Sequence, residues 1–152
     1  MTPNIFLLLN LALAFYNVGT IWAIEIDIFR SWKFLDGKTF HIVQHVHWKK
    51  LPYWIFIPVG LALIGTITLF WYHPGKISNR EIWLALILQV LSHLLTAIFW
   101  GPWQAKLSKD ESGGESAFLK KILKTHWIRT VLINAYALTL LYMNIQTLSG
   151  VQ

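Results

Sequence analysis

Residues 51–75, LPYWIFIPVGLALIGTITLFWYHPG, contain no Asp, Glu, Lys or Arg. A helix that crosses the hydrocarbon core of a bilayer needs about 20 predominantly apolar residues, and this stretch is long enough. Three further stretches, residues 1–24, 82–105 and 130–152, are equally free of charged side chains. The pattern predicts four membrane-spanning helices, at Asn4–Ile24, Pro52–Tyr72, Arg80–Trp100 and about Leu123–Leu148.

The composition of the whole chain favours the same fold class. Of its 152 residues, 55% are hydrophobic and 13% are charged, and the mean hydropathy is +0.49. A soluble four-helix bundle would need a polar face along each helix, and none of useful width is present. The first segment lacks the basic start and cleavage site of a signal peptide, so we expect a retained helix. We therefore predict an all-α integral membrane four-helix bundle, with residues 1–152 as a single transmembrane domain.

The distribution of Lys and Arg predicts the orientation. A tight hairpin, HPGKISN, joins the second and third helices, whereas the other two connections are longer and lie at the opposite end. The longer connections and adjoining helix ends carry most of the basic residues: Arg30, Lys33, Lys38, Lys49, Lys50, Lys106, Lys109, Lys120, Lys121, Lys124 and Arg129. By the positive-inside rule this end is cytoplasmic and both termini are outside. The net charge of +6 then reflects cytoplasmic loops rather than binding to nucleic acid.

The first connection contains the sequence DGKTFHIVQHVHWKK, which predicts a short amphipathic helix at the membrane interface. At a helical period its apolar and polar residues separate. The apolar side holds Phe40, Ile42, Val43 and Val46, and the polar side holds His41, Gln44, His45 and Trp48. The second connection contains SKDESGGES, which predicts a flexible polar tip.

Most of the unusual polar residues are expected in the cytoplasmic half of the bundle. They are Glu25 and Asp27, three loop histidines (His41, His45 and His47), His93, His126 and Arg129. His93 belongs to a stripe with Gln89, Thr96 and Trp100, which share one helix face. Ionisable groups at membrane depth are costly and usually face a bundle interior, a cavity or a partner.

Each residue also has a purely structural interpretation. His93 can be neutral and satisfied by one hydrogen bond, and Glu25 can pair with Arg30 or Arg129. The Arg129 side chain can extend to lipid phosphate. Asn10, Asn17 and Asn134 are typical of hydrogen bonds between helices.

Three kinds of chemistry fit this group of residues. His41, His45, His93 and Glu25 could ligate iron, zinc or copper, because imidazole and carboxylate suit these metals. A haem would need an axial histidine such as His93. A site without a cofactor would use His93 or His126 as a base, with Arg129 stabilising an anion.

The order of three motifs resembles a known family. These are F-x-x-x-Q-H-x-H-W before the second helix, TAIFWGPWQAKL at the end of the third and HWIRT at the start of the fourth. The sequence resembles a large bacterial family of small four-helix membrane proteins related to the anthrone oxygenase-like proteins, which oxidise polycyclic aromatic anthrones with molecular oxygen. The resemblance implies location in the bacterial inner (cytoplasmic) membrane.

Carried over by position, the resemblance implies functional roles for His45, His47, Thr96, Pro102, Leu107, Trp127, Arg129 and Thr130. His126 stands where many relatives have Asn, and IEIDIF replaces a segment with a proline after the first helix. These departures make Glu25, Asp27 and His126 candidates for a role particular to this protein.

The leading hypothesis is a membrane-embedded, oxygenase-like oxidoreductase. It would act on a lipophilic aromatic or quinone-like substrate at a His/Glu/Arg site in the cytoplasmic half of the bundle. The alternative is a non-enzymatic accessory subunit that binds pigment, haem or lipid in a larger membrane complex. Both leave a homo-oligomer open, and both predict the lipid bilayer and a lipophilic small molecule as partners.

Overall fold

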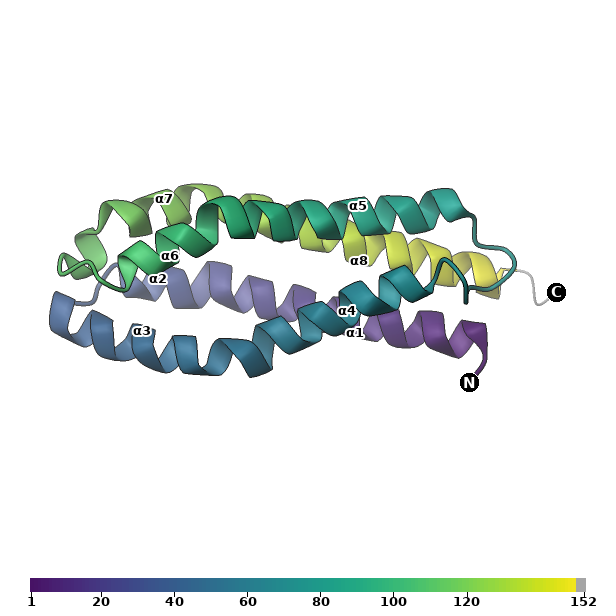
Figure 1. The fold of residues 1–152 in the computed structure, drawn as a ribbon, viewed down its shortest axis with the longest axis horizontal. Coiled ribbons are helices and arrows are strands. Elements are labelled where there is room, and N and C mark those ends of the chain that lie inside the picture. Colours follow the sequence, from purple (N-terminus) through teal and green to yellow (C-terminus); the bar gives the residue numbers. More distant parts are fainter. Residues whose placement is uncertain (150–152) are drawn as a thin grey trace.

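The computed structural model describes residues 1–149, and this part of the chain contains helices and no strands. Four long apolar helices cover Pro3–Trp32, Gly37–Thr68, Asn79–Leu107 and Ala117–Leu148. Figure 1 shows them side by side in an elongated bundle. Each has between 29 and 32 residues, which is about 45 Å at 1.5 Å per residue. The expected fold class is confirmed in its all-α character, and each helix is long and apolar enough to cross a membrane.

Every long helix is interrupted once. In the first three, a π-helical turn separates two α-helical parts. The parts are α1 (Pro3–Ala23), η1 (Ile24–Ile28) and α2 (Phe29–Trp32); α3 (Gly37–Leu51), η2 (Pro52–Phe56) and α4 (Ile57–Thr68); and α5 (Asn79–Leu95), η3 (Thr96–Trp100) and α6 (Gly101–Leu107). The fourth divides at His126 into α7 (Ala117–Thr125) and α8 (Trp127–Leu148).

Proline accounts for two of the three π-helical turns, because it has no N–H to donate. Pro58 cannot donate to the carbonyl of Trp54, and the Tyr16 hydroxyl donates to that oxygen instead, at 3.2 Å. Next to Pro102, the Gly101 N–H reaches back five residues to the carbonyl of Thr96. Backbone groups in an apolar environment need hydrogen-bond partners, so these alternative hydrogen bonds stabilise the bent helices.

The turn η1 has no proline. Its N–H to carbonyl bond runs from Phe29 to Ile24, five residues back. The carbonyl of Glu25 accepts a hydrogen bond from Arg30 Nε at 3.1 Å. The wider turn therefore comes with a local side-chain partner for the backbone.

The bundle has two hydrophobic cores, one toward each end. The hairpin end contains residues 69–78, and the loop end contains residues 33–36 and 108–116. The hairpin-end core consists of Leu7, Leu11, Ala14, Leu69, Ile77, Ile82, Ala85, Tyr136, Ala137, Leu140 and Met143. The loop-end core consists of Ile21, Ile24, Phe29, Trp32, Phe40, Leu51, Ile55, Leu107, Leu119 and Ile122.

Helix α8 is the central element of the packing, because it contacts α1 and α5 along their length. Helix α4 approaches α1 closely at Gly65, where an added Cβ would lie 1.9 Å from Asn10 Oδ1. Met1 and the end of α8 lie together at the hairpin end (Figure 1). At the hairpin, Ser78 N donates to Glu81 Oε2 at 2.8 Å, which is part of a capping box at the start of α5.

The short amphipathic helix predicted at the interface is helical, as α3, but the structure does not show it as an element of its own. Helix α3 runs through η2 into α4 as one bent helix of 32 residues. Its buried residues are Phe40, Gln44 and Leu51, whereas Ile42 and Val46 are exposed. Gln44, predicted on the polar side, is 1% exposed and donates to the carbonyl of Gln104 at 3.3 Å.

The second connection is packed rather than a free polar tip. Gly114 N donates to the carbonyl of Leu35 at 3.0 Å. Gly113 has a φ of +58°, a conformation that favours glycine. The Asp110 carboxylate accepts hydrogen bonds from Ser112 and Ser116, which lower the pKa of that carboxyl below its ordinary value. The Gly114–Leu35 bond joins the two connections at the loop end, and the Asp110 bonds hold the second connection together.

Candidate functional site

A buried carboxylate–imidazole pair connects the first and fourth helices. The Glu25 and His126 side chains are 6% and 0% exposed, and His126 Nδ1 lies 3.0 Å from Glu25 Oε2. The other carboxylate oxygen, Oε1, pairs with Arg30 at 2.9 Å, and Arg30 itself is 55% exposed. Glu25 thus joins a surface guanidinium to a fully buried imidazole.

The contacts of His126 fix its orientation. Its ring packs edge to face against Phe29, at 4.8 Å between centroids, and against Trp100, at 5.6 Å. Because a carboxylate accepts hydrogen bonds, Nδ1 carries the proton toward Glu25. Nε2 is then the free acceptor, and it is buried without a hydrogen-bond partner among residues 1–149.

A cavity of about 230 Å³ lies in the middle of the bundle. All four long helices contribute to its lining, which is mostly apolar. The lining residues are Asn17, Phe56, Val59, Gln89, Ser92, His93, Thr96, Ala97, Gly101, Arg129, Ile133 and Tyr136. Ligand sites typically combine such apolar walls with a few convergent polar groups.

Arg129 is the charged group of this cavity. No carboxylate of residues 1–149 lies within 4.0 Å of it, since the ion pairs there join other residues. Its Nε is buried and has no acceptor, and the same holds for Thr130 Oγ1 on the next residue. Arg129 as a whole is half-buried, but a guanidinium placed against apolar walls without a counter-ion is still costly. The cavity is therefore suited to an anionic or strongly polar group of a ligand.

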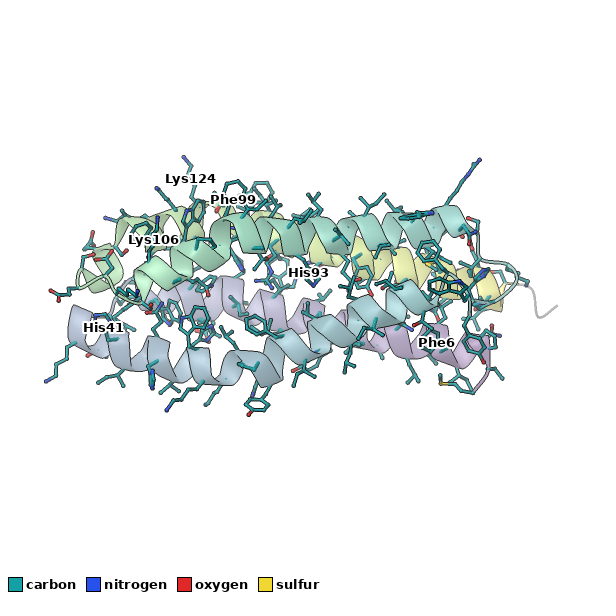
Figure 2. All side chains as sticks on the ribbon, in the orientation of Figure 1. Phe6, His41, His93, Phe99, Lys106 and Lys124 are labelled. Atoms are coloured by element: carbon teal, nitrogen blue, oxygen red, sulfur yellow. The ribbon has the colours of Figure 1, made fainter. Side chains whose placement is uncertain are left out.

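His93 enters the cavity from α5. In Figure 2 its ring projects from that helix toward the interior of the bundle. Nδ1 hydrogen-bonds the carbonyl of Gln89 one turn earlier, so Nδ1 carries the proton and Nε2 is the free base. The Oε1 of Gln89 is a further buried acceptor without a partner in the described part of the chain.

The predicted stripe on the third helix is confirmed as a face toward the bundle. Gln89, His93 and Thr96 line the cavity. Trp100, the last member, donates from Nε1 to Thr125 Oγ1 at 3.0 Å and covers His126. Of the predicted catalytic residues, His93 and Arg129 line the cavity. His126 lies one turn before Arg129 but does not line the cavity, because it packs against Phe29 and Trp100.

The four predicted metal ligands are not brought together. Glu25 pairs with His126, and His93 lies in the cavity. His41 and His45 each follow a buried residue of α3 by one position, so they point about 100° away from its buried face; His45 is exposed. In residues 1–149 no group of three or more His, Cys, Asp or Glu is placed to hold a metal ion. The described residues therefore do not form the expected metal centre.

Two further residues of the cavity, Asn17 and Tyr136, are not among the predicted site residues. Tyr136 lines the cavity, and its hydroxyl hydrogen-bonds Thr66 Oγ1 at 2.9 Å. It follows Arg129 and Ile133 at helical spacing, so it shares their helix face. Asn17, expected only to join helices, also lines the cavity.

Comparisons with known proteins add no relative. No protein-family model, no curated protein and no solved structure matches this chain.

Proposed function

We propose that this chain is an integral membrane protein with the loop end in the cytoplasm, and that it is an oxygenase-like oxidoreductase. Its substrate would be a lipophilic aromatic or quinone-like compound bound in the cavity. The observation that carries this proposal is the Arg129 guanidinium, which lies in a mostly apolar cavity beside His93 and has no carboxylate partner in the described chain.

The polar groups of the cavity suit a substrate with a weakly acidic C–H or O–H. His93 Nε2 would take the proton as a general base. Arg129 would stabilise the resulting enolate or phenolate oxygen, where an apolar environment strengthens the charge interaction. The aromatic rings of the substrate would contact Phe56, Val59 and Ile133.

Oxidation of an anthrone-like ring by molecular oxygen follows from this anion. The carbanion form of the substrate supplies the electrons that reduce O₂, and one oxygen atom becomes the new ring carbonyl. The second oxygen atom leaves with the two hydrogens of the original ring CH₂ as water. Atoms and electrons balance with O₂ as the oxidant.

Access from the bilayer is consistent with the position of the cavity. Phe56 of the second helix and Ala97 of the third line it and are exposed. Those side chains lie on the surface that lipid would cover in a membrane. A lipophilic substrate could therefore enter laterally between the two helices.

The test is oxygen uptake by the detergent-purified protein with anthrones and hydroquinones. We expect turnover that falls by about 10²–10⁴-fold in His93→Ala. His73→Ala is the matched control, because His73 lies at the hairpin end and, within residues 1–149, its side chain hydrogen-bonds the carbonyl of Pro74 and no other group. Turnover that survives in His93→Ala would contradict the proposal. Tight binding without oxygen uptake would instead support the accessory, non-enzymatic alternative.

A further inference from the structure

A second and larger hollow lies outside the cavity, as a groove of about 750 Å³ between the first and second long helices. The residues that line it on the first helix run from Phe15 to Trp32, and those on the second run from Val43 to Ile55. The groove is therefore about 25 Å long at 1.5 Å per residue. Its walls are mostly apolar and include no residue of the cavity around Arg129.

The groove changes character along its length. Toward the hairpin end it is lined by Phe15, Tyr16, Gly19, Ala23 and Trp54, and toward the loop end by Asp27, Ser31, His47 and Lys50. In the sequence, residues 1–24 and 51–75 carry no charge, and the first charged residues beyond them are Glu25 and Lys50. The groove thus crosses the level at which the two helices pass from apolar to charged sequence.

The polar part of the groove contains two oppositely charged side chains, those of Asp27 and Lys50. Neither Asp27 nor Lys50 has an ion-pair partner within 4.0 Å in residues 1–149. Both residues line the same groove. Asp27 follows the charge-free stretch 1–24, and Lys50 directly precedes the charge-free stretch 51–75. A ligand that satisfies both would carry a negative and a positive group next to one another, attached to a long apolar chain.

We propose that this groove binds one zwitterionic phospholipid with an ammonium headgroup. The acyl chain would lie along Phe15, Gly19 and Trp54, the phosphate would pair with Lys50, and the ammonium group would pair with Asp27. The proposal rests on the membrane location proposed above, but not on oxidoreductase activity. It assigns a second site, distinct from the cavity of Arg129.

Gly19 provides a way to block the groove without disturbing the fold. Apart from the helix's own nearby backbone, no atom of residues 1–149 lies within 4 Å of a Cβ added at Gly19 or at Gly60. Gly19 lines the groove, whereas Gly60 lines neither hollow. Gly19→Leu would therefore fill the groove, and Gly60→Leu is the matched control. Both replace glycine within a helix by a better helix former, so neither should lower the unfolding midpoint.

The experiment is native mass spectrometry of the protein in mild detergent, titrated with phosphatidylethanolamine or phosphatidylglycerol. We expect the wild type and Gly60→Leu to retain one phosphatidylethanolamine per chain, and Gly19→Leu to lose it. Lys50→Gln should weaken binding of both lipids by about tenfold. Asp27→Asn should weaken only the preference for phosphatidylethanolamine.

Equal lipid retention by the wild type and Gly19→Leu would overturn the proposal, as would equal affinity for the two headgroups in the wild type. Arg129→Gln should retain the lipid, because Arg129 does not line the groove. Loss of function in the cavity and loss of the lipid site are thus distinguishable.

Discussion

The two ends of the bundle share helices but not chemistry. The hairpin-end core is built mainly from Leu, Ile and Ala on regular α-helix. The loop half contains the π-helical turns η1 and η3, together with the buried Glu25–His126 pair. Such turns widen a helix locally and are frequent at functional sites. The loop half thus combines its own hydrophobic core with a buried ionisable pair, and we propose that ligand binding depends more on this half than on the hairpin half.

The largest effect should come from the buried pair. Glu25→Ala leaves the buried His126 Nδ1–H without an acceptor and opens a cavity where the carboxylate was, so we expect a combined loss of about 3–5 kcal/mol of stability. The measurement is thermal unfolding in detergent, followed by circular dichroism. Glu25→Gln is the matched control, since its amide oxygen can still accept one hydrogen bond. If Glu25→Ala unfolds at the wild-type temperature, the pair does not stabilise the loop half.

A core variant in the hairpin half should separate stability from ligand binding. Leu140 is fully buried there, and Leu140→Ala should cost about 2–5 kcal/mol, because it removes methyl groups and leaves a cavity. Below the unfolding midpoint, we expect ligands of the Arg129 cavity to bind with unchanged affinity. Ligand titration at low temperature checks this. A large loss of affinity would show that the two halves do not act separately.

Tyr136 belongs to both regions, because it lies in the hairpin-end core and lines the cavity. Tyr136→Phe removes its hydrogen bond to Thr66 and should cost about 1 kcal/mol. Its ring remains, so the packing is kept. Comparison of unfolding midpoints for Tyr136→Phe and Thr66→Val tests the pairing, and clearly additive losses in the double variant would show that the two hydroxyls act independently.

The smallest effect concerns the connection at the loop end. Hydrogen bonds from Ser112 and Ser116 lower the pKa of Asp110 below 3.8. The ionised form is favoured in the folded loop, so its contribution is fully present above the unfolded pKa of 3.8 and is lost as the pH falls through the lower folded pKa. Limited proteolysis of the 108–116 segment should therefore accelerate only in acid. Asp110→Asn should remove this pH dependence, and an unchanged profile would contradict it.

Much of the bundle could be predicted from the sequence, because charge-free runs and breakers determine it. The tight hairpin between the second and third helices followed from local patterns. The ends of the long helices could not be predicted in this way, because the segments beyond the apolar runs carry charges. Those ends are helical because residues such as Phe40 and Leu119 pack in a second core, which no local pattern reveals.

The candidate site was predictable in part. The face of His93 and the position of Arg129 followed from helical spacing. The metal ligand set did not form, because the direction of His41 and His45 depends on which face of α3 is buried. Prolines at 52, 58 and 102 gave a signal for two π-helical turns. The turn around Glu25 has no proline, so its pairing with His126 depends on tertiary packing.

Binding of a visible-absorbing hydroxyanthraquinone to the protein in lipid nanodiscs tests the role of Arg129. Arg129→Gln and the control His73→Ala would be compared with the wild type by absorbance titration near neutral pH. The cavity as described predicts binding by the wild type and His73→Ala, and a loss of about tenfold or more in Arg129→Gln. Equal binding by all three proteins would contradict the assignment of Arg129 as the anion-binding group of this cavity.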